Sequence, residues 1–139
     1  MNLSKNVKVV LAKAAAAAAT TAVNSDIIDT AGYEGVLFVG SIGTANAGNY
    51  VKLQQGDNSS LTDGADLENT KVVPGDDGDS FMVDFYRPKD RYVRAVVTRG
   101  ASTTVGDIYA ILYGAHAKPT SHGSTIDSET HVSPDEGTA

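Results

Sequence analysis

Residues 80–98 read SFMVDFYRPKDRYVRAVVT, two runs rich in apolar side chains joined by a polar turn. In the first run Phe81, Val83 and Phe85 fall on one face, because successive side chains of a β-strand point to opposite sides. The second run, 92–98, is rich in the valine and tyrosine that strands favour. Pro88 lies in the Arg-Pro-Lys-Asp turn between them. The stretch predicts a β-hairpin, and the rest of the fold is built around it.

Two runs far apart in the sequence are apolar on both faces. Residues 33–42 alternate Val36 and Phe38 with Leu37 and Val39, and residues 105–113 are similar. A strand that is apolar on both faces is typical of the centre of a fold, covered on both sides. This is more apolar surface than a small isolated sandwich covers, so we expect the chain to associate with itself.

The remaining strands are shorter. Residues 50–55 alternate as a strand with one wet face, and residues 25–30 and 71–73 predict two further strands. The loop 56–69 carries Leu61 and Leu67, which we expect to close the open end of the core. Six to eight short strands at roughly ten-residue spacing predict an all-β fold, a single β-sandwich or jelly-roll-like domain over residues 23–115.

The first 22 residues predict an N-terminal arm. They carry only basic charges, Lys5, Lys8 and Lys13, followed by the alanine run 14–19. That run favours helix but is too short to be stable alone, so we expect at most one short helix within residues 3–19. We expect removal of residues 1–19 to leave the domain folded. The same stretch also imitates a secretory signal, with small residues near Ala22.

The last 24 residues, 116–139, predict an extended tail. Ile126 and Val132 are the only large aliphatic side chains in a segment of Ser, Thr, His, Asp, Glu, Pro and Gly. Such a composition cannot bury enough apolar surface to fold alone. Its net charge is opposite to that of the first 20 residues, which suits either arms that dock on neighbouring subunits or solvated tails.

Composition narrows the classes of function. The chain has 139 residues, a net charge of −6 and no cysteine, so disulfides and thiolate metal sites are excluded. An acidic chain argues against non-specific nucleic-acid binding, which needs a concentrated basic face. No apolar run approaches the roughly 20 residues of a membrane span.

No motif in the sequence predicts a cofactor, a metal or catalysis. The acidic loop 57–68 has the length of an EF-hand loop, but Leu61 stands where an oxygen ligand is required and Thr62 where glycine is required. His116, His122 and His131 lie in the tail, without a scaffold to fix metal geometry or a nucleophile elbow. We therefore predict no catalytic, metal or cofactor residues.

The basic cluster of residues 86–94 is the densest candidate for binding. Arg87 and Arg91 flank the Pro88 turn beside Tyr92, with Arg94 following, and arginine with tyrosine is the pair favoured at interface hot spots. The alternative is a hairpin whose arginines pair with Asp84, Asp90 or Asp107 of the same subunit. With Lys5, Lys8 and Lys13, these residues are the predicted interface with a partner protein or with another subunit.

Several stretches of the chain resemble the small head decoration (cement) proteins of tailed bacteriophages. They are IIDTAGYEGVLF (27–38), VKLQQG (51–56), YRP (86–88), RYVRAV (91–96) and HVSP (131–134). The resemblance implies a compact β-sandwich or jelly roll on the outer surface of a virion capsid, made in the host cytoplasm. It also implies a partner, the major capsid protein, and often a homotrimer over a local threefold axis, with no catalytic residues.

Two other functions remain open from the sequence. One is a head-to-tail joining or tail component, and the other is a secreted surface- or carbohydrate-binding β-sandwich. Neighbouring genes for a capsid protein and protease would favour the decoration protein, and neighbouring tail genes would favour the tail component. Cleavage near Ala22 on secretion would identify the secreted protein.

Overall fold

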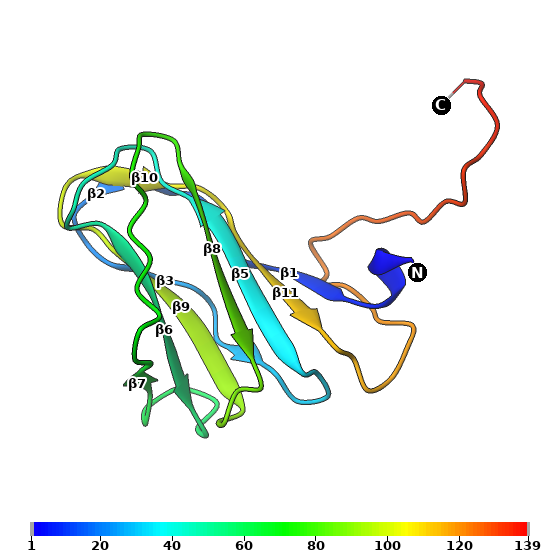
Figure 1. Ribbon diagram of the computed structural model, residues 1–139, viewed down its shortest axis with the longest axis horizontal. Helices are drawn as coiled ribbons and strands as arrows, with labels where there is room; N and C mark the ends of the chain where they lie inside the picture. The colour runs from blue at the N-terminus through cyan, green and yellow to red at the C-terminus, as the bar shows by residue number, and fades with distance from the viewer. Residues whose placement is uncertain (1, 139) are drawn as a thin grey trace.

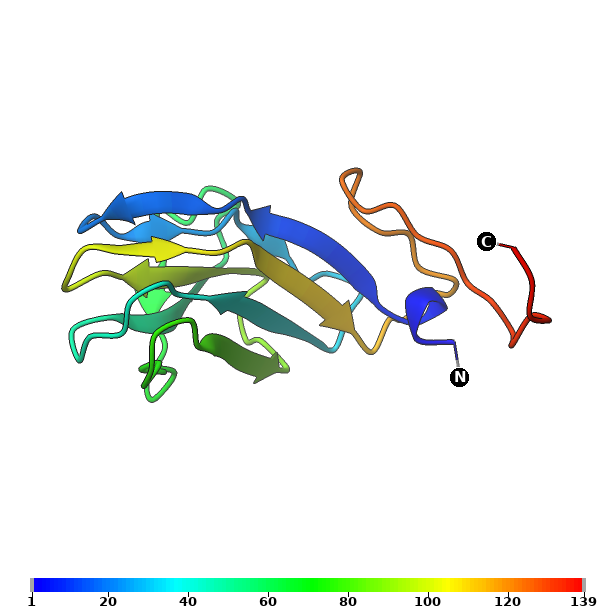
Figure 2. The same ribbon diagram turned by 90° about the horizontal axis from the view of Figure 1, so that it is seen from above.

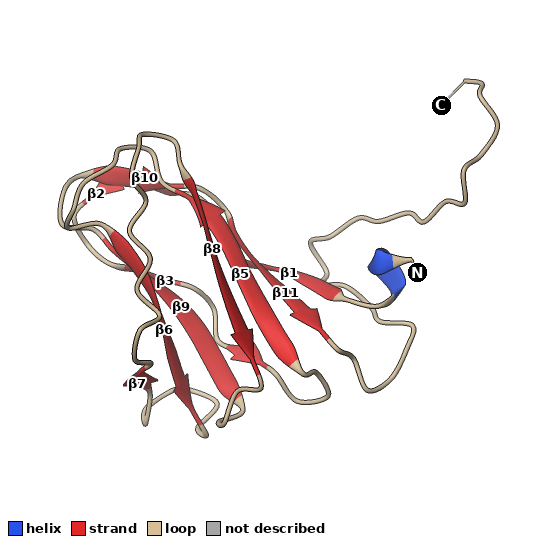
Figure 3. Cartoon of the chain, in the orientation of Figure 1, coloured by secondary structure: helices blue, strands red, loops and turns tan. Residues whose placement is uncertain are grey.

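Among residues 2–138, six strands have six or seven residues, and five of these coincide with runs that the sequence predicts as strands. The five are β5 (Gly35–Ser41), β6 (Tyr50–Gly56), β8 (Ser80–Tyr86), β9 (Tyr92–Thr98) and β11 (Ile108–Tyr113). The computed structural model describes residues 2–138, in which the one helical element is a 3-10 turn, Leu3–Lys5 (Figure 3). The predicted all-β class is confirmed.

The strands form a β-sandwich of antiparallel sheets (Figure 1). The four-stranded sheet has the order β1-β11-β5-β8, with β1 spanning Lys8–Lys13. The five-stranded sheet has the order β3-β9-β6-β7, with β4 also paired to β9; its short members are β3 (Val23–Asn24), β4 (Ile28–Asp29) and β7 (Ala65–Asp66). A two-stranded ribbon of β2 (Ala16–Ala19) and β10 (Thr103–Val105) lies at one end.

The core fills the space between the two sheets. Phe38 and Phe81 project from the four-stranded sheet and are almost fully buried, and Leu53 faces them from β6. Leu61 is 6% exposed, and Leu67 packs against the core cluster. The expectation that the loop 56–69 closes the core is therefore confirmed.

The predicted N-terminal arm is wrong for residues 8–19. β1 pairs with β11 from Lys8 opposite Leu112 to Leu11 opposite Tyr109, and the Ala12 side chain is fully buried in the core. The alanine run supplies β2, which pairs with β10. Removal of residues 1–19 would take away both strands, so we now expect this deletion to destabilise the domain. The edges of β11 and β10 are paired by β1 and β2, and that long-range pairing overrides the helix propensity of the alanine run.

The predicted hairpin of residues 80–98 is wrong as well. β8 pairs with β5 along its whole length, whereas β9 pairs with β6, so the two strands belong to different sheets. The turn at residues 87–91 therefore carries the chain from one sheet to the other. Each strand still points its apolar face into the same core, which is why the alternation alone does not reveal the crossover.

Of the predicted strand 25–30 only β4 (Ile28–Asp29) forms, and β3 (Val23–Asn24) lies just before it. β3 and β4 both pair with β9, and the interruption between them is bridged by Ser25, whose N–H donates to the Ala95 carbonyl while its hydroxyl oxygen accepts the Ala95 N–H. Lys71–Val73 supplies only an isolated bridge, between Val72 and Val51.

A buried arginine fastens the two-stranded ribbon to the sandwich. Arg99 is 6% exposed and donates hydrogen bonds to the carbonyl oxygens of Ala17, Thr21 and Thr103 at 2.6–2.8 Å. These contacts hold the alanine run against β10. Two of these acceptors, Ala17 and Thr21, are far from Arg99 in the sequence, so no local pattern predicts the role of this arginine.

The C-terminal segment lines the edge of β1 before it leaves the domain. The Thr120 hydroxyl donates to the Val7 carbonyl, the Val9 N–H donates to His122 Nδ1, and the Gly123 N–H donates to the Val9 carbonyl. Residues 124–138 then run on as loop beyond the end of the sandwich (Figure 2). Within residues 2–138, no helix is long and apolar enough to cross a membrane.

Candidate functional site

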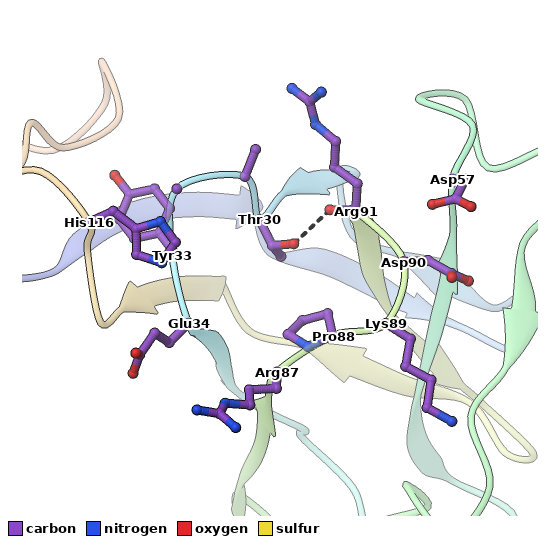
Figure 4. Close-up of a pocket in the computed structure, with 12 residues that line it drawn as sticks. Thr30, Tyr33, Glu34, Asp57, Arg87, Pro88, Lys89, Asp90, Arg91 and His116 are labelled. Carbon is purple, nitrogen blue, oxygen red and sulfur yellow. Dashed lines mark hydrogen bonds between the residues drawn. The ribbon is translucent and has the colours of Figure 1, made fainter.

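The crossover turn, residues 87–91, forms one wall of a depression at the end of the sandwich. The turn 30–34, Asp57 and His116 supply the other walls, and the volume is about 530 Å³ (Figure 4). The Thr30 hydroxyl donates to the Arg91 carbonyl at 2.7 Å, which joins the two turns. The His116 N–H donates to the Gly32 carbonyl and fixes the start of the C-terminal segment beside them.

Arg91 is held by an ion pair with Asp29. Its Nε and Nη2 each lie 2.8 Å from one carboxylate oxygen of Asp29, and its guanidinium carbon lies 5.3 Å from the centre of the Tyr92 ring. The hydrogen bonds from Arg91 hold the pKa of Asp29 below its usual value. Both side chains are about half exposed, so this pair fixes geometry more than it stabilises the fold. Much of the Arg91 charge is thereby neutralised.

Arg87 is held in a strained backbone conformation. Its φ is +52°, in the left-handed region that favours glycine, and its N–H donates to the Glu34 carbonyl at 2.7 Å. The guanidinium lies 5.2 Å from the Tyr86 ring centre, and Figure 4 places Arg87 and Glu34 on the same side of the depression. Strain of this kind persists only where the surroundings impose it, and it is concentrated at functional sites.

The hypothesis that the arginines pair with Asp84, Asp90 or Asp107 is wrong for the described residues. Arg91 forms its ion pair with Asp29. The Asp84 carboxylate accepts a hydrogen bond from the Tyr113 hydroxyl, and the Asp107 carboxylate accepts one from the Ala15 N–H. Within residues 2–138, the salt bridges include none to Arg87 or Lys89. These two cations are the ones that the turn presents to solvent.

The other predicted interface residues are dispersed. Lys8 lies at the same end as Arg91 and contributes to the lowered pKa of Asp29, whereas Lys13 lies at the far end of β1. Lys5 belongs to the 3-10 turn. Arg94 donates to Gln54 Oε1 at 2.8 Å on the outside of the five-stranded sheet.

The depression has mixed charge. Arg87, Lys89 and Arg91 face a lining that also contains the three acids Glu34, Asp57 and Asp90. Such a surface can select the orientation of a charged partner through exposed ion pairs. Within residues 2–138, no group of three potential ligands is arranged to hold a metal ion.

Sequence reasoning missed Asp29, whose carboxylate holds Arg91, and Glu34, whose backbone carbonyl accepts the Arg87 N–H. They lie about 60 and 50 residues upstream, and neither lies in a recognisable motif. The signal that could have found them is local: Asp29 and Glu34 flank Gly32, whose φ of +85° marks the turn that forms the second wall.

Comparisons with known proteins assign no family. No family model matches the chain, and no curated protein matches it. A solved structure similar to the chain is the family two carbohydrate esterase from Cellvibrio japonicus, at 8% identity and a TM-score of 0.31. The similarity covers 86% of this chain and 35% of the esterase chain, about a third of its length. At that TM-score it carries no argument about function.

Proposed function

We propose that the protein is a decoration (cement) protein that binds the outside of a bacteriophage capsid and bridges subunits of the major capsid protein. The observation that carries the proposal is the C-terminal segment, residues 124–138. It leaves the sandwich as loop, and Ser4 to Thr130 is the one hydrogen bond that joins it to residues before Gly123 within the described chain. A segment that makes so few contacts with its own domain suits a role on a neighbour.

The chemistry of the segment supports docking on a polar lattice. It contains the acids Asp127, Glu129, Asp135 and Glu136 and no lysine or arginine, and Val132 is 85% exposed. An extended acidic chain with one exposed aliphatic side chain can pair with basic groups of a partner and insert a single apolar anchor. At the same end of the sandwich Arg87 and Lys89 offer the opposite charge. The resemblance of the sequence to head decoration proteins supplies the class of partner.

The test is a cryo-electron reconstruction of the virion of the phage that encodes this chain. We expect density for the sandwich on the outer capsid surface, with residues 124–138 lying against a major capsid subunit. Density in the tail or at the head-to-tail joint, or absence of the chain from the virion, would refute the proposal.

A binding assay on capsids lacking the chain tests the segment itself. We expect truncation after Gly123 to remove no strand, to leave the unfolding free energy within about 0.5 kcal/mol and to lower capsid occupancy. Arg87→Asn, which tolerates the left-handed backbone, should also lower occupancy. The matched control is Lys13→Asn, which removes one charge at the far end of β1 and should leave occupancy unchanged.

A further inference from the structure

The outer face of the four-stranded sheet carries two largely apolar rows, bordered at one end by the polar pair Ser41 and Ser80. Side chains that are paired across strands share one face, so the register assigns its rows. One row runs across the sheet as Leu11, Tyr109, Val39 and Met82. The next row is Val9, Ile111, Leu37 and Asp84.

The outer face of the five-stranded sheet is polar by comparison. Its paired rows place Tyr50 beside Thr98 and Gln54 beside Arg94, and Lys52 lies between them. Each sheet has one face on the common core, so the difference concerns only the faces that look outward. An antiparallel sheet normally keeps such a face polar because water covers it. The two apolar rows of the four-stranded sheet lack this property.

Asp84 is the one ionisable acid in these two rows, and it already has a partner. Its carboxylate accepts the Tyr113 hydroxyl at 2.6 Å, and the Tyr113 ring stacks on Tyr86 with 6.5 Å between centroids. The Tyr113 side chain crosses Gly35 to reach Asp84; a β-carbon at Gly35 would lie 2.4 Å from its ring. The third row of the face is thus a pair of aromatic rings, and the face can be covered without leaving a carboxylate unpaired.

The chain itself leaves the face open. Met82 is 63% exposed and Tyr86 is 53% exposed, and both lie on β8, at the free edge of the sheet. The C-terminal segment bonds to the backbone of β1 at the opposite edge. The apolar side chains that the two rows contribute from β1, β11 and β5 are partly exposed, so exposure is greatest at the β8 edge.

The size of the face suits a weak, specific contact. Four strands at about 4.8 Å spacing and three rows at about 6.8 Å give a projected area of about 400 Å², including the side chains at the margins. The side chains stand upright on the sheet, so the accessible area that a contact would bury is larger than this projected area. It approaches the roughly 600 Å² buried per partner at the low end of specific interfaces.

We propose that this outer face binds the same face of a second copy of the chain, forming a two-fold symmetric dimer. A partner of opposite charge has nothing to recognise on the face, whereas a second identical face is apolar, of equal size and free of unpaired carboxylates. A two-fold contact also covers both open faces with one surface. The two sheets would pack about 10 Å apart, as sheets do within a sandwich.

This dimer goes beyond the proposed capsid function and does not depend on it. It differs from the homotrimer that the resemblance to decoration proteins implies, because a threefold assembly requires two different surfaces on each copy. The proposal can therefore fail while the capsid function stands.

Analytical ultracentrifugation of the full chain between about 1 and about 100 µM tests the proposal, since interfaces of moderate size begin to associate at micromolar concentration. We expect a monomer–dimer equilibrium. Val39→Lys places a charge in the middle of the face and should weaken association at least tenfold. Gln54→Lys, on the outer face of the other sheet, should leave it unchanged.

Met82→Lys provides a second variant if Val39→Lys does not fold, since Met82 is largely exposed in the single chain. It should also weaken association, with circular dichroism matching the parent protein. A monomer at every concentration, a trimer, or a dimer that both lysine variants leave intact would overturn the proposal.

Discussion

Replacement of Ala12 by aspartate tests whether β1 belongs to the folded core. The Ala12 side chain is fully buried in the core cluster. A carboxyl group there escapes desolvation by staying protonated, since burial raises a carboxyl pKa by as much as about 3–5 units. Holding it protonated at pH 7 costs 1.36 kcal/mol for each unit between pH 7 and its ordinary pKa near 3.9, or about 4 kcal/mol. Extra atoms in a packed core add about 1–3 kcal/mol.

The expected loss in unfolding free energy is therefore about 5 kcal/mol or more, comparable with the whole stability of a small domain. The loss should depend on pH with a definite sign. The pKa of the new carboxyl is higher in the folded than in the unfolded chain. The loss in unfolding free energy therefore grows as the pH rises above about 3.9, and it levels off above the pKa of the carboxyl in the folded chain. The stability of the variant is then closest to that of the parent protein near pH 4.

Urea unfolding followed by circular dichroism at pH 4 and pH 7 measures both effects. The control is Ala14→Asp, because Ala14 is exposed immediately after β1 and an acid there should change stability by no more than about 0.5 kcal/mol. Equal stability of the Ala12 and Ala14 variants would show that residues 8–13 are a dispensable arm and would refute the pairing of β1 with β11.

Three further predictions concern single side chains. Arg91 lowers the pKa of Asp29, so Arg91→Gln should lower the unfolding free energy by a constant amount above about pH 4. This difference from the parent protein should vanish as the pH falls through the lowered pKa of Asp29. Equal pH profiles of the two proteins would contradict the prediction. Burial and the hydrogen bond to Asp84 raise the pKa of Tyr113, so Asp84→Asn should make Tyr113 ionise earlier in an alkaline absorbance titration, and an unchanged titration would count against the bond. Arg99→Met should lower the unfolding free energy by about 2–4 kcal/mol and speed amide exchange in β2 and β10, whereas unchanged exchange there would show that Arg99 does not hold the ribbon.

The sequence predicts the long strands because their alternation is a local property. β5 and β11 are apolar on both faces, and both lie inside the four-stranded sheet. Pairing is different, since no local pattern distinguishes a hairpin from a crossover. Residues 80–98 would read the same if β8 and β9 were neighbours, and only the partners β5 and β6 decide that they are not.

The same limit applies to the N-terminal segment and to the depression. Residues 8–13 alternate Val9 and Leu11 with Val10 and Ala12, but Lys13 and the alanine run conceal the strand. β2 pairs with β10 and also accepts a hydrogen bond from Arg99, which lies 82 residues from Ala17 in the sequence. The predicted arginines of the crossover turn do line the depression. Glu34 in its lining, and Asp29 as the partner of Arg91, meet these arginines only in the folded chain.

The pairing of β1 with β11 has a consequence during synthesis on the ribosome. Lys13 is opposite Ile108, and 108 − 13 = 95 residues separate them. At about 5–20 residues per second, β1 emerges roughly 5–20 s before its partner exists. During that interval the strand has no native neighbour, and such exposed apolar segments are where nascent chains aggregate or recruit chaperones. A circularly permuted chain that places β1 directly after β11 should shorten this vulnerable interval and give a higher soluble yield.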